Sequence, residues 1–101
     1  QELTAFNQAA RAANNNIQLA VATAYLDLLQ AEGLVAINAE TLANAEFMLK
    51  NAKTAIAAGK SSTGADALRA GTEVEARKQE RFQLLANVDV RAARLAELLL
   101  L

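Results

Sequence analysis

The sequence predicts an all-α protein, specifically a long antiparallel coiled-coil helical hairpin with one long and one shorter helix. Three observations support this prediction. The 101 residues include no proline and only four glycines, so nothing forces a helix to break often. Large apolar side chains recur every seven residues along the first half of the chain. The turn-forming residues are concentrated in one short segment, residues 59–64.

The first helix is expected at about residues 2–58 and carries the seven-residue repeat. Its large seam residues are Val21, Leu28, Val35, Leu42, Leu49 and Ile56. The second seam position holds small or polar residues, namely Ala24, Ala31, Asn38, Ala45 and Ala52. Alternation of large residues with alanine lets two helices approach closely in a left-handed coiled coil. Asn38 is expected to set the register of the pair, as a polar residue in such a seam often does.

The N-terminal part of this helix is expected to lack a partner within the chain. At 1.5 Å per residue the first helix would be roughly 85 Å long and the second about 50 Å, so Leu101 would reach back only to about Val21. A four-residue step from Ile17 to Val21 interrupts the repeat at the same place, as a stutter does. The first helix also has a second apolar stripe, which predicts neighbours on two sides. That stripe consists of Ala22, Leu26, Leu29, Ala36, Ala43 and Phe47.

The tip turn is expected at residues 59–64, with Gly59 in the left-handed conformation that ends a helix. Thr63 is the expected N-cap of the second helix, with Asp66 as the acid three residues later. That helix is expected at about residues 65–100, with a solvated face over residues 73–81 and an ion pair between Glu73 and Arg77. Its predicted seam is Val74, Leu85, Val88, Ala92, Leu95 and Leu99, and Lys78 and Arg81 fall on the same seam.

Composition and spacing argue against several classes of function. The chain has no Cys or His, and its carboxylates at Asp27, Glu32, Glu40 and Glu46 are spread along one helix without converging partners. We therefore expect no enzyme activity, no cofactor and no metal site. A net charge of −1 predicts no nucleic-acid partner. No uninterrupted run of about 18 apolar residues is present, so no membrane-spanning helix is expected. The start at Gln1 is interpreted as that of a piece of a longer protein.

Three features resemble the first periplasmic helical hairpin of the TolC-like family of outer-membrane efflux proteins. The first is the aromatic-centred segment Ala22-Thr23-Ala24-Tyr25-Leu26-Asp27-Leu28-Leu29, and the second is the stretch from Thr23 to Gly59, whose length matches the family's spacing between that segment and the glycine that closes the helix. The third is the Asp66-Ala67-Leu68-Arg69-Ala70 start of the returning helix, which runs on to Arg94-Leu95-Ala96-Glu97-Leu98-Leu99 near its end. The tip is one residue longer than the family's usual pattern.

This resemblance implies that the chain is a fragment of an α-helical barrel in the periplasm. The family's channels are trimers that sit in the cell outer membrane through β-barrel segments and serve efflux or type I secretion. A periplasmic adaptor protein joins them to an inner-membrane pump in a tripartite assembly. By resemblance, the adaptor would contact the tip residues Gly59, Lys60, Ser61, Ser62, Thr63 and Gly64. Asp66 would be a candidate gate residue. Without the resemblance, these residues form a surface turn, and Asp66 is a first-turn acid worth about 0.5–1 kcal/mol to the helix.

Two alternative functions remain open at the level of sequence. The chain could be the coiled-coil hairpin of a periplasmic adaptor (membrane fusion) protein, although such hairpins tend to have arms of equal length. It could also be a generic helical oligomerisation scaffold with no role in transport.

Overall fold

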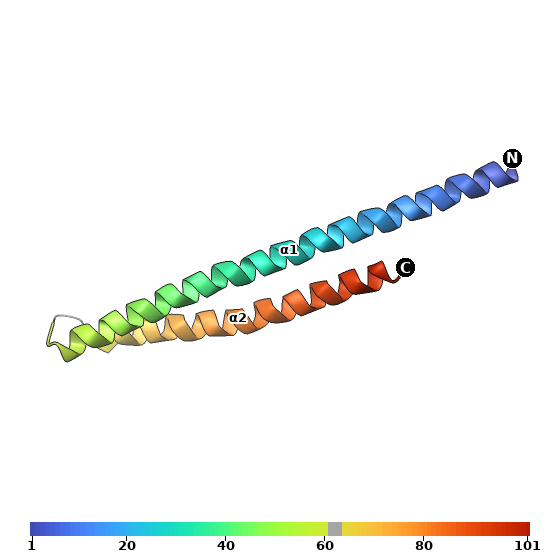
Figure 1. Ribbon diagram of the computed structural model, residues 1–101. Helices are drawn as coiled ribbons and strands as arrows, with labels where there is room; N and C mark the ends of the chain where they lie inside the picture. Colours follow the sequence, from blue (N-terminus) through green and yellow to red (C-terminus); the bar gives the residue numbers. More distant parts are fainter. Residues whose placement is uncertain (61–63) are drawn as a thin grey trace. The chain divides into compact units, whose positions relative to one another are not determined.

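The computed structural model describes residues 1–60 and 64–101, and all secondary structure in them is helical. Helix α1 spans Glu2–Ala57 and helix α2 spans Gly64–Leu99 (Figure 1). Each helix therefore begins and ends within one residue of its predicted bounds. The prediction of an all-α helical hairpin with one long and one shorter helix is confirmed.

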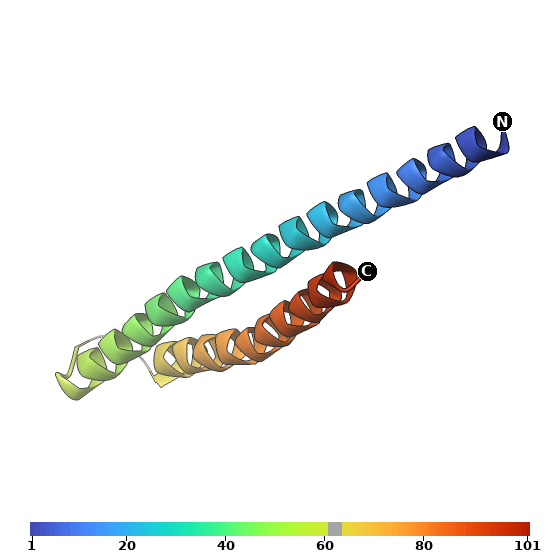
Figure 2. The ribbon, with the colours of Figure 1, turned by 45° about the vertical axis from the view of Figure 1, so that its right-hand side comes forward.

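The chain divides into two compact units, and both contain a piece of each helix. One unit consists of residues 33–86, and the other of residues 1–32 together with residues 87–101. Within residues 33–86, Asn38 of α1 contacts Arg77 of α2, and Leu49 lies beside Gly71. The residue numbers thus rise along α1 as they fall along α2, so the two helices run antiparallel in this unit (Figure 2).

The core of residues 33–86 lies on the predicted seam of α1. Leu42, Ala45 and Val74 are buried together, and Leu49 packs against them. Ala45 is small enough for the backbones of α1 and α2 to approach, while Leu42 and Val74 fill the space between them. The seven-residue repeat therefore identified the correct face of α1.

The unit formed by residues 1–32 and 87–101 has an apolar contact of its own. Ala24, Ala31 and Leu98 are buried in it. Asp27 Oδ2 and Arg91 Nη1 form an ion pair across the two helices at 3.9 Å, with both side chains nearly half exposed. Every residue from 1 to 19 is exposed, but Asn16, Leu19 and Ala20 line a shallow groove with α2, so the expectation that residues 1–20 lack a partner within the chain holds only for the part before Asn16.

The predicted seam of α2 was only partly right. Val74, Val88 and Leu95 are buried or half-buried as expected, but Lys78, Arg81, Leu85, Ala92 and Leu99 are exposed. The predicted seam placed the second buried position of each seven-residue repeat four residues after the first, as Lys78 follows Val74. In the structure it lies three residues after the first, and the buried or half-buried residues at that position are Ala70, Arg77, Leu84 and Leu98. Arginine at this position hides the stripe in the sequence, because its aliphatic stem packs while its charged head stays near water.

For the same reason, residues 73–81 do not form a fully solvated face. Val74 is buried and Arg77 is half-buried within that segment. The predicted ion pair is present, with Arg77 Nε 3.1 Å from Glu73 Oε1.

Helix α1 is more apolar than a count of uninterrupted apolar residues suggests. An 18-residue window within it reaches a mean hydropathy of 1.3, which by length and composition is enough to cross a membrane. The expectation of no membrane-spanning helix rested on a different criterion, an uninterrupted run of about 18 apolar residues, which α1 does not contain. Only 11% of that window is buried, so its apolar side chains are available to something outside the chain.

Candidate functional site

The end of α1 forms the base of the candidate site at the hairpin tip. Gly59 has φ of 72°, the left-handed conformation that the sequence predicts for it. Its N–H donates to the carbonyl of Ile56 at 3.1 Å, and the N–H of Lys60 donates to the carbonyl of Ala55 at 2.9 Å. These two bonds make a Schellman motif, which satisfies carbonyl groups left free at a helix end. The place where α1 stops is thus determined by Gly59.

The start of α2 forms the other side of the tip. Gly64 is its first residue and Asp66 lies in its first turn. A carboxylate at that place is favoured by the helix dipole, and Asp66 is already engaged in an interaction. The predicted tip residues Ser61, Ser62 and Thr63, including the expected Thr63 N-cap, lie outside the described residues.

A shallow groove of about 370 Å³ begins beside the tip and runs between the two helices. Its floor is apolar because small seam residues face each other there, and Met48 adds a flexible apolar wall. Charged side chains of α2 border it. The groove is lined by Ala45, Met48, Ala52, Asp66, Arg69, Ala70 and Glu73.

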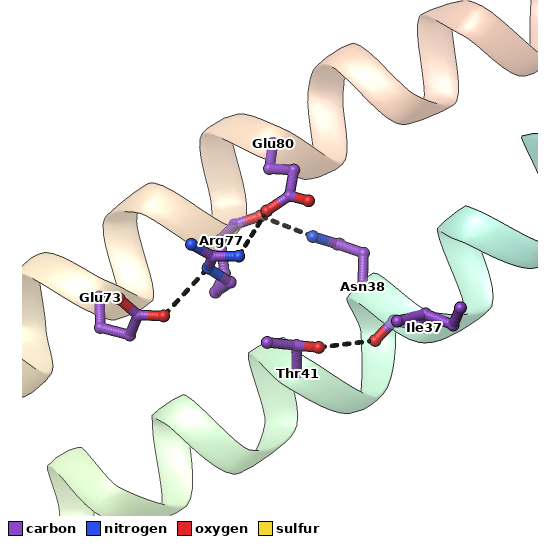
Figure 3. Close-up of polar contacts among 6 residues, drawn as sticks. All are labelled: Ile37, Asn38, Thr41, Glu73, Arg77 and Glu80. Atoms are coloured by element: carbon purple, nitrogen blue, oxygen red, sulfur yellow. Dashed lines mark hydrogen bonds and ion pairs between the residues drawn. The ribbon is translucent and has the colours of Figure 1, made fainter.

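The charges along this groove are of both signs, so it has no strong field of one sign. Arg69 is its one cation, between the carboxylates of Asp66 and Glu73. Glu73 is also paired with Arg77, whose Nη1 lies 2.7 Å from Glu80 Oε2 (Figure 3). Such a mixed border over an apolar floor suits contact with another protein surface better than capture of one small ion.

A buried polar contact lies farther from the tip. Asn38 is only 3% exposed, and its Nδ2 donates to the carbonyl of Arg77 at 3.1 Å (Figure 3). Asn38 Oδ1 is buried without a hydrogen-bond donor within the described part of the chain. Arg77 Nε, although 3.1 Å from Glu73 Oε1, does not meet the geometry of a hydrogen bond and forms an ion pair only.

The tip and Asp66 were predicted as site residues from the sequence, and the groove was not. Met48 was not singled out because it belongs to no motif, and Arg69 was named only as part of the Asp66–Ala70 start of the returning helix. The signal that would have found the groove is the coincidence of Ala45, Ala52 and Ala70 at facing seam positions. Alanine was interpreted only as allowing close approach of the helices, whereas near the tip it also leaves an open hollow.

In the described residues, no group of three or more His, Cys, Asp or Glu side chains is placed to hold a metal ion. Of the carboxylates spread along α1, Asp27 is paired with Arg91. No protein-family model matches the chain, and no curated protein and no solved structure matches it either.

Proposed function

We propose that this chain forms part of the periplasmic α-helical tunnel of an outer-membrane efflux or type I secretion channel. In this proposal the hairpin docks to a periplasmic adaptor protein through its tip and the groove beside it. The full-length channel is a trimer connected to an inner-membrane pump. The observation that supports this proposal most strongly is that α1 carries two apolar stripes, of which only one is covered.

The covered stripe of α1 packs against α2, and the uncovered stripe is the one predicted from Ala22 to Phe47. Its large members Leu26 and Phe47 are each 64% exposed. A helix in an isolated hairpin has no use for a second stripe, whereas a helix in a wall of helices has a neighbour on each side. The wall of a tunnel is such an arrangement.

The tip and the groove support adaptor docking. The Schellman motif at Gly59 holds the end of α1 in a defined conformation, so the tip is attached to a rigid helix. Exposed turns on rigid elements are common places of recognition. The groove extends this surface with an apolar floor that a partner side chain can fill.

Asp66 lines this groove, and we propose it as a residue that stabilises the closed periplasmic entrance through a polar link to a neighbouring hairpin. Its first-turn position is equally suited to stabilising α2, and that role stands whether or not the gate exists.

The second candidate function is the hairpin of an adaptor protein. The lengths of the helices favour the channel, because α1 has 56 residues and α2 has 36. A generic scaffold would use the uncovered stripe of α1 but would need neither the groove nor a defined tip.

The docking proposal is tested in the full-length protein with Arg69→Glu, which reverses the one cation of the groove. We expect efflux and adaptor crosslinking to fall while the abundance of the protein and its trimeric state are retained. Arg81→Glu is the matched control, because Arg81 is exposed on the same helix and does not line the groove. Wild-type crosslinking and wild-type efflux in the Arg69 variant would rule out docking at the groove.

A further inference from the structure

Each helix of residues 33–86 has an outer stripe that its own partner helix leaves mostly uncovered. The outer stripe of α1 is Gly33, Ala36, Glu40, Ala43, Phe47 and Lys50, at alternating steps of three and four residues. The outer stripe of α2 is Leu68, Gly71, Glu75, Lys78, Phe82 and Leu85, with the same alternation. All of these residues are exposed except Gly71, which is half-buried. Such spacing is that of a coiled-coil seam.

The heights of the two stripes can be compared because both lie in one compact unit. The bond from Asn38 to Arg77 places residues near 38 of α1 level with residues near 77 of α2. The contact between Leu49 and Gly71 places residues near 49 level with residues near 71. The two contacts bracket the register: moving away from the tip, they place Ala36 level with residues 79–84 and Gly33 level with residues 82–87, ranges that include Phe82 and Leu85.

At matching heights the two stripes are complementary in size. Phe82, which is 70% exposed, lies level with Ala36, and Leu85 lies level with Gly33. A Cβ added to Gly33 would meet nothing within 4 Å, so the surface there is open. Near the tip the sizes are reversed, since the bulky residue is Phe47 of α1 and the small one is Gly71 of α2. Gly71 lines a shallow hollow of about 430 Å³ that Leu49 and Lys53 of α1 and Leu68 and Glu75 of α2 border.

The charges on the stripes are complementary too. Glu40 is the acid on the outer stripe of α1, and Lys78 on that of α2 lies at the same height. Glu40 has no ion-pair partner in the described part of the chain. Among residues 1–60 and 64–101, the one ion pair of Lys78 is a loose contact at 3.6 Å with Glu75 of its own helix.

We propose that copies of this chain pair side by side and in the same direction, with the outer stripe of α2 in one copy packed against the outer stripe of α1 in the next. Phe82 of one copy then covers Ala36 of the next, Phe47 of the next copy enters the hollow at Gly71, and Lys78 pairs with Glu40. The two surfaces differ, so the contact is head-to-tail and leaves one stripe free on each outer copy. This inference specifies the self-association of the proposed function and rests on it, but not on transport.

The test uses single-cysteine variants of the 101-residue chain, which contains no native cysteine. Ala36→Cys chains are mixed with Phe82→Cys chains under mild oxidation. We expect disulfide-linked dimers in the mixture and none from either variant alone, because a disulfide needs Cα atoms within about 7 Å. A chain with both substitutions is expected to form a ladder of longer species. Ile37→Cys mixed with Phe82→Cys is the matched control, since Ile37 is exposed and about 100° around the helix from Ala36.

The charge pair provides a second measurement that does not depend on Phe82 packing. Adding Lys78→Glu to both chains is expected to cause loss of the crosslinked dimer, and adding Glu40→Lys as well is expected to restore it. A mixture that gives no more dimer than the Ile37 control, or a charge reversal that Glu40→Lys fails to restore, would overturn the proposal. Because no adaptor or pump is present, failure here is distinguishable from failure of docking at Arg69.

Discussion

Asn38 is the one buried polar side chain in the described part of the seam, and its contribution to stability is small for a physical reason. It gains one hydrogen bond, to the carbonyl of Arg77, and leaves Oδ1 buried without a donor. A buried hydrogen bond contributes about 1 kcal/mol net, and a buried unsatisfied acceptor costs about as much. The two effects nearly cancel, so Asn38 serves register more than stability.

We therefore expect Asn38→Ala to change the free energy of unfolding by less than about 1 kcal/mol, because alanine already occupies the equivalent position at Ala31 and Ala45. Asn38→Asp is expected to lower the free energy of unfolding by about 2 kcal/mol or more, because it would place a buried carboxylate next to the carbonyl oxygen of Arg77. Urea unfolding of dilute protein measures both. A loss above 2 kcal/mol in the alanine variant would show that the hydrogen bond dominates.

Leu42 and Leu85 test which face of each helix is buried. Leu42 is 8% exposed and belongs to the core cluster, so Leu42→Ala is expected to cost about 2–3 kcal/mol through lost burial and a cavity. Leu85 is 40% exposed, so Leu85→Ala is expected to cost less than about 1 kcal/mol in the monomer. Equal losses of unfolding free energy in the two variants, measured with urea, would show that Leu85 lies on the buried face of α2, as the sequence predicted.

At the level of single residues, the sequence predicted the seam of α1 better than that of α2. Leucine, valine and alanine at the seam of α1 are apolar in any environment, so their spacing alone shows the buried face. On α2, Arg77 occupies a seam position through its apolar stem, and hydrophobicity alone assigns arginine to solvent. Only coordinates show which part of the arginine is packed.

At the level of elements, the bounds of both helices could be predicted because glycine acts locally. Gly59 ends α1 through its own backbone preference, whatever the rest of the chain does. The groove beside the tip could not be predicted in the same way, because it depends on which small residues of two helices face each other. That pairing is a tertiary property: the sequence shows the alanines Ala45, Ala52 and Ala70, but only the register of the two helices brings them together.

Gly59→Ala tests the end of α1. The left-handed backbone at Gly59 penalises any Cβ by about 1 kcal/mol, although nothing lies within 4 Å of the added atom. We expect destabilisation by about that amount in urea unfolding, with a smaller loss for Gly59→Asn. Gly64→Ala is the control, because Gly64 is helical and lacks the positive φ. It is expected to be neutral or slightly stabilising.

Gly33→Ala is expected to act in opposite directions on the helix and on the pairing of copies. Alanine in the middle of α1 should stabilise the monomer by about 0.5–1 kcal/mol, since the added Cβ meets nothing within 4 Å. The same methyl group would fill the space that Leu85 of a second copy takes in the proposed contact. The midpoint temperature of thermal unfolding should therefore rise while sedimentation shows weaker association. A rise in both the midpoint temperature and the degree of association would contradict the proposed contact at Gly33.

For the whole molecule, the uncovered outer stripes of residues 33–86 predict association in solution. A chain with Phe47, Leu68 and Phe82 mostly exposed leaves a large apolar surface in contact with water. We expect sedimentation of the purified chain to show oligomers that increase with concentration. Phe47→Ser with Phe82→Ser is expected to shift the distribution to monomer without loss of helix content. A strictly monomeric native chain would contradict the uncovered stripe as the basis of the proposed tunnel wall.

The N-terminal part of α1 provides the last test, because it adds length to the helix without adding any burial within the chain. Residues 1–13 are all exposed, and the groove that Asn16, Leu19 and Ala20 line with α2 does not include them. Short helical segments without tertiary contacts are marginal in water, so their ordering depends on the rest of α1 or on a neighbouring molecule. Deleting residues 1–13 is therefore expected to change the free energy of unfolding of the dilute chain by less than about 0.5 kcal/mol. A loss above about 1.5 kcal/mol in urea unfolding would mean that this stretch has a partner within the chain, and that the protruding helix is not free to meet another molecule.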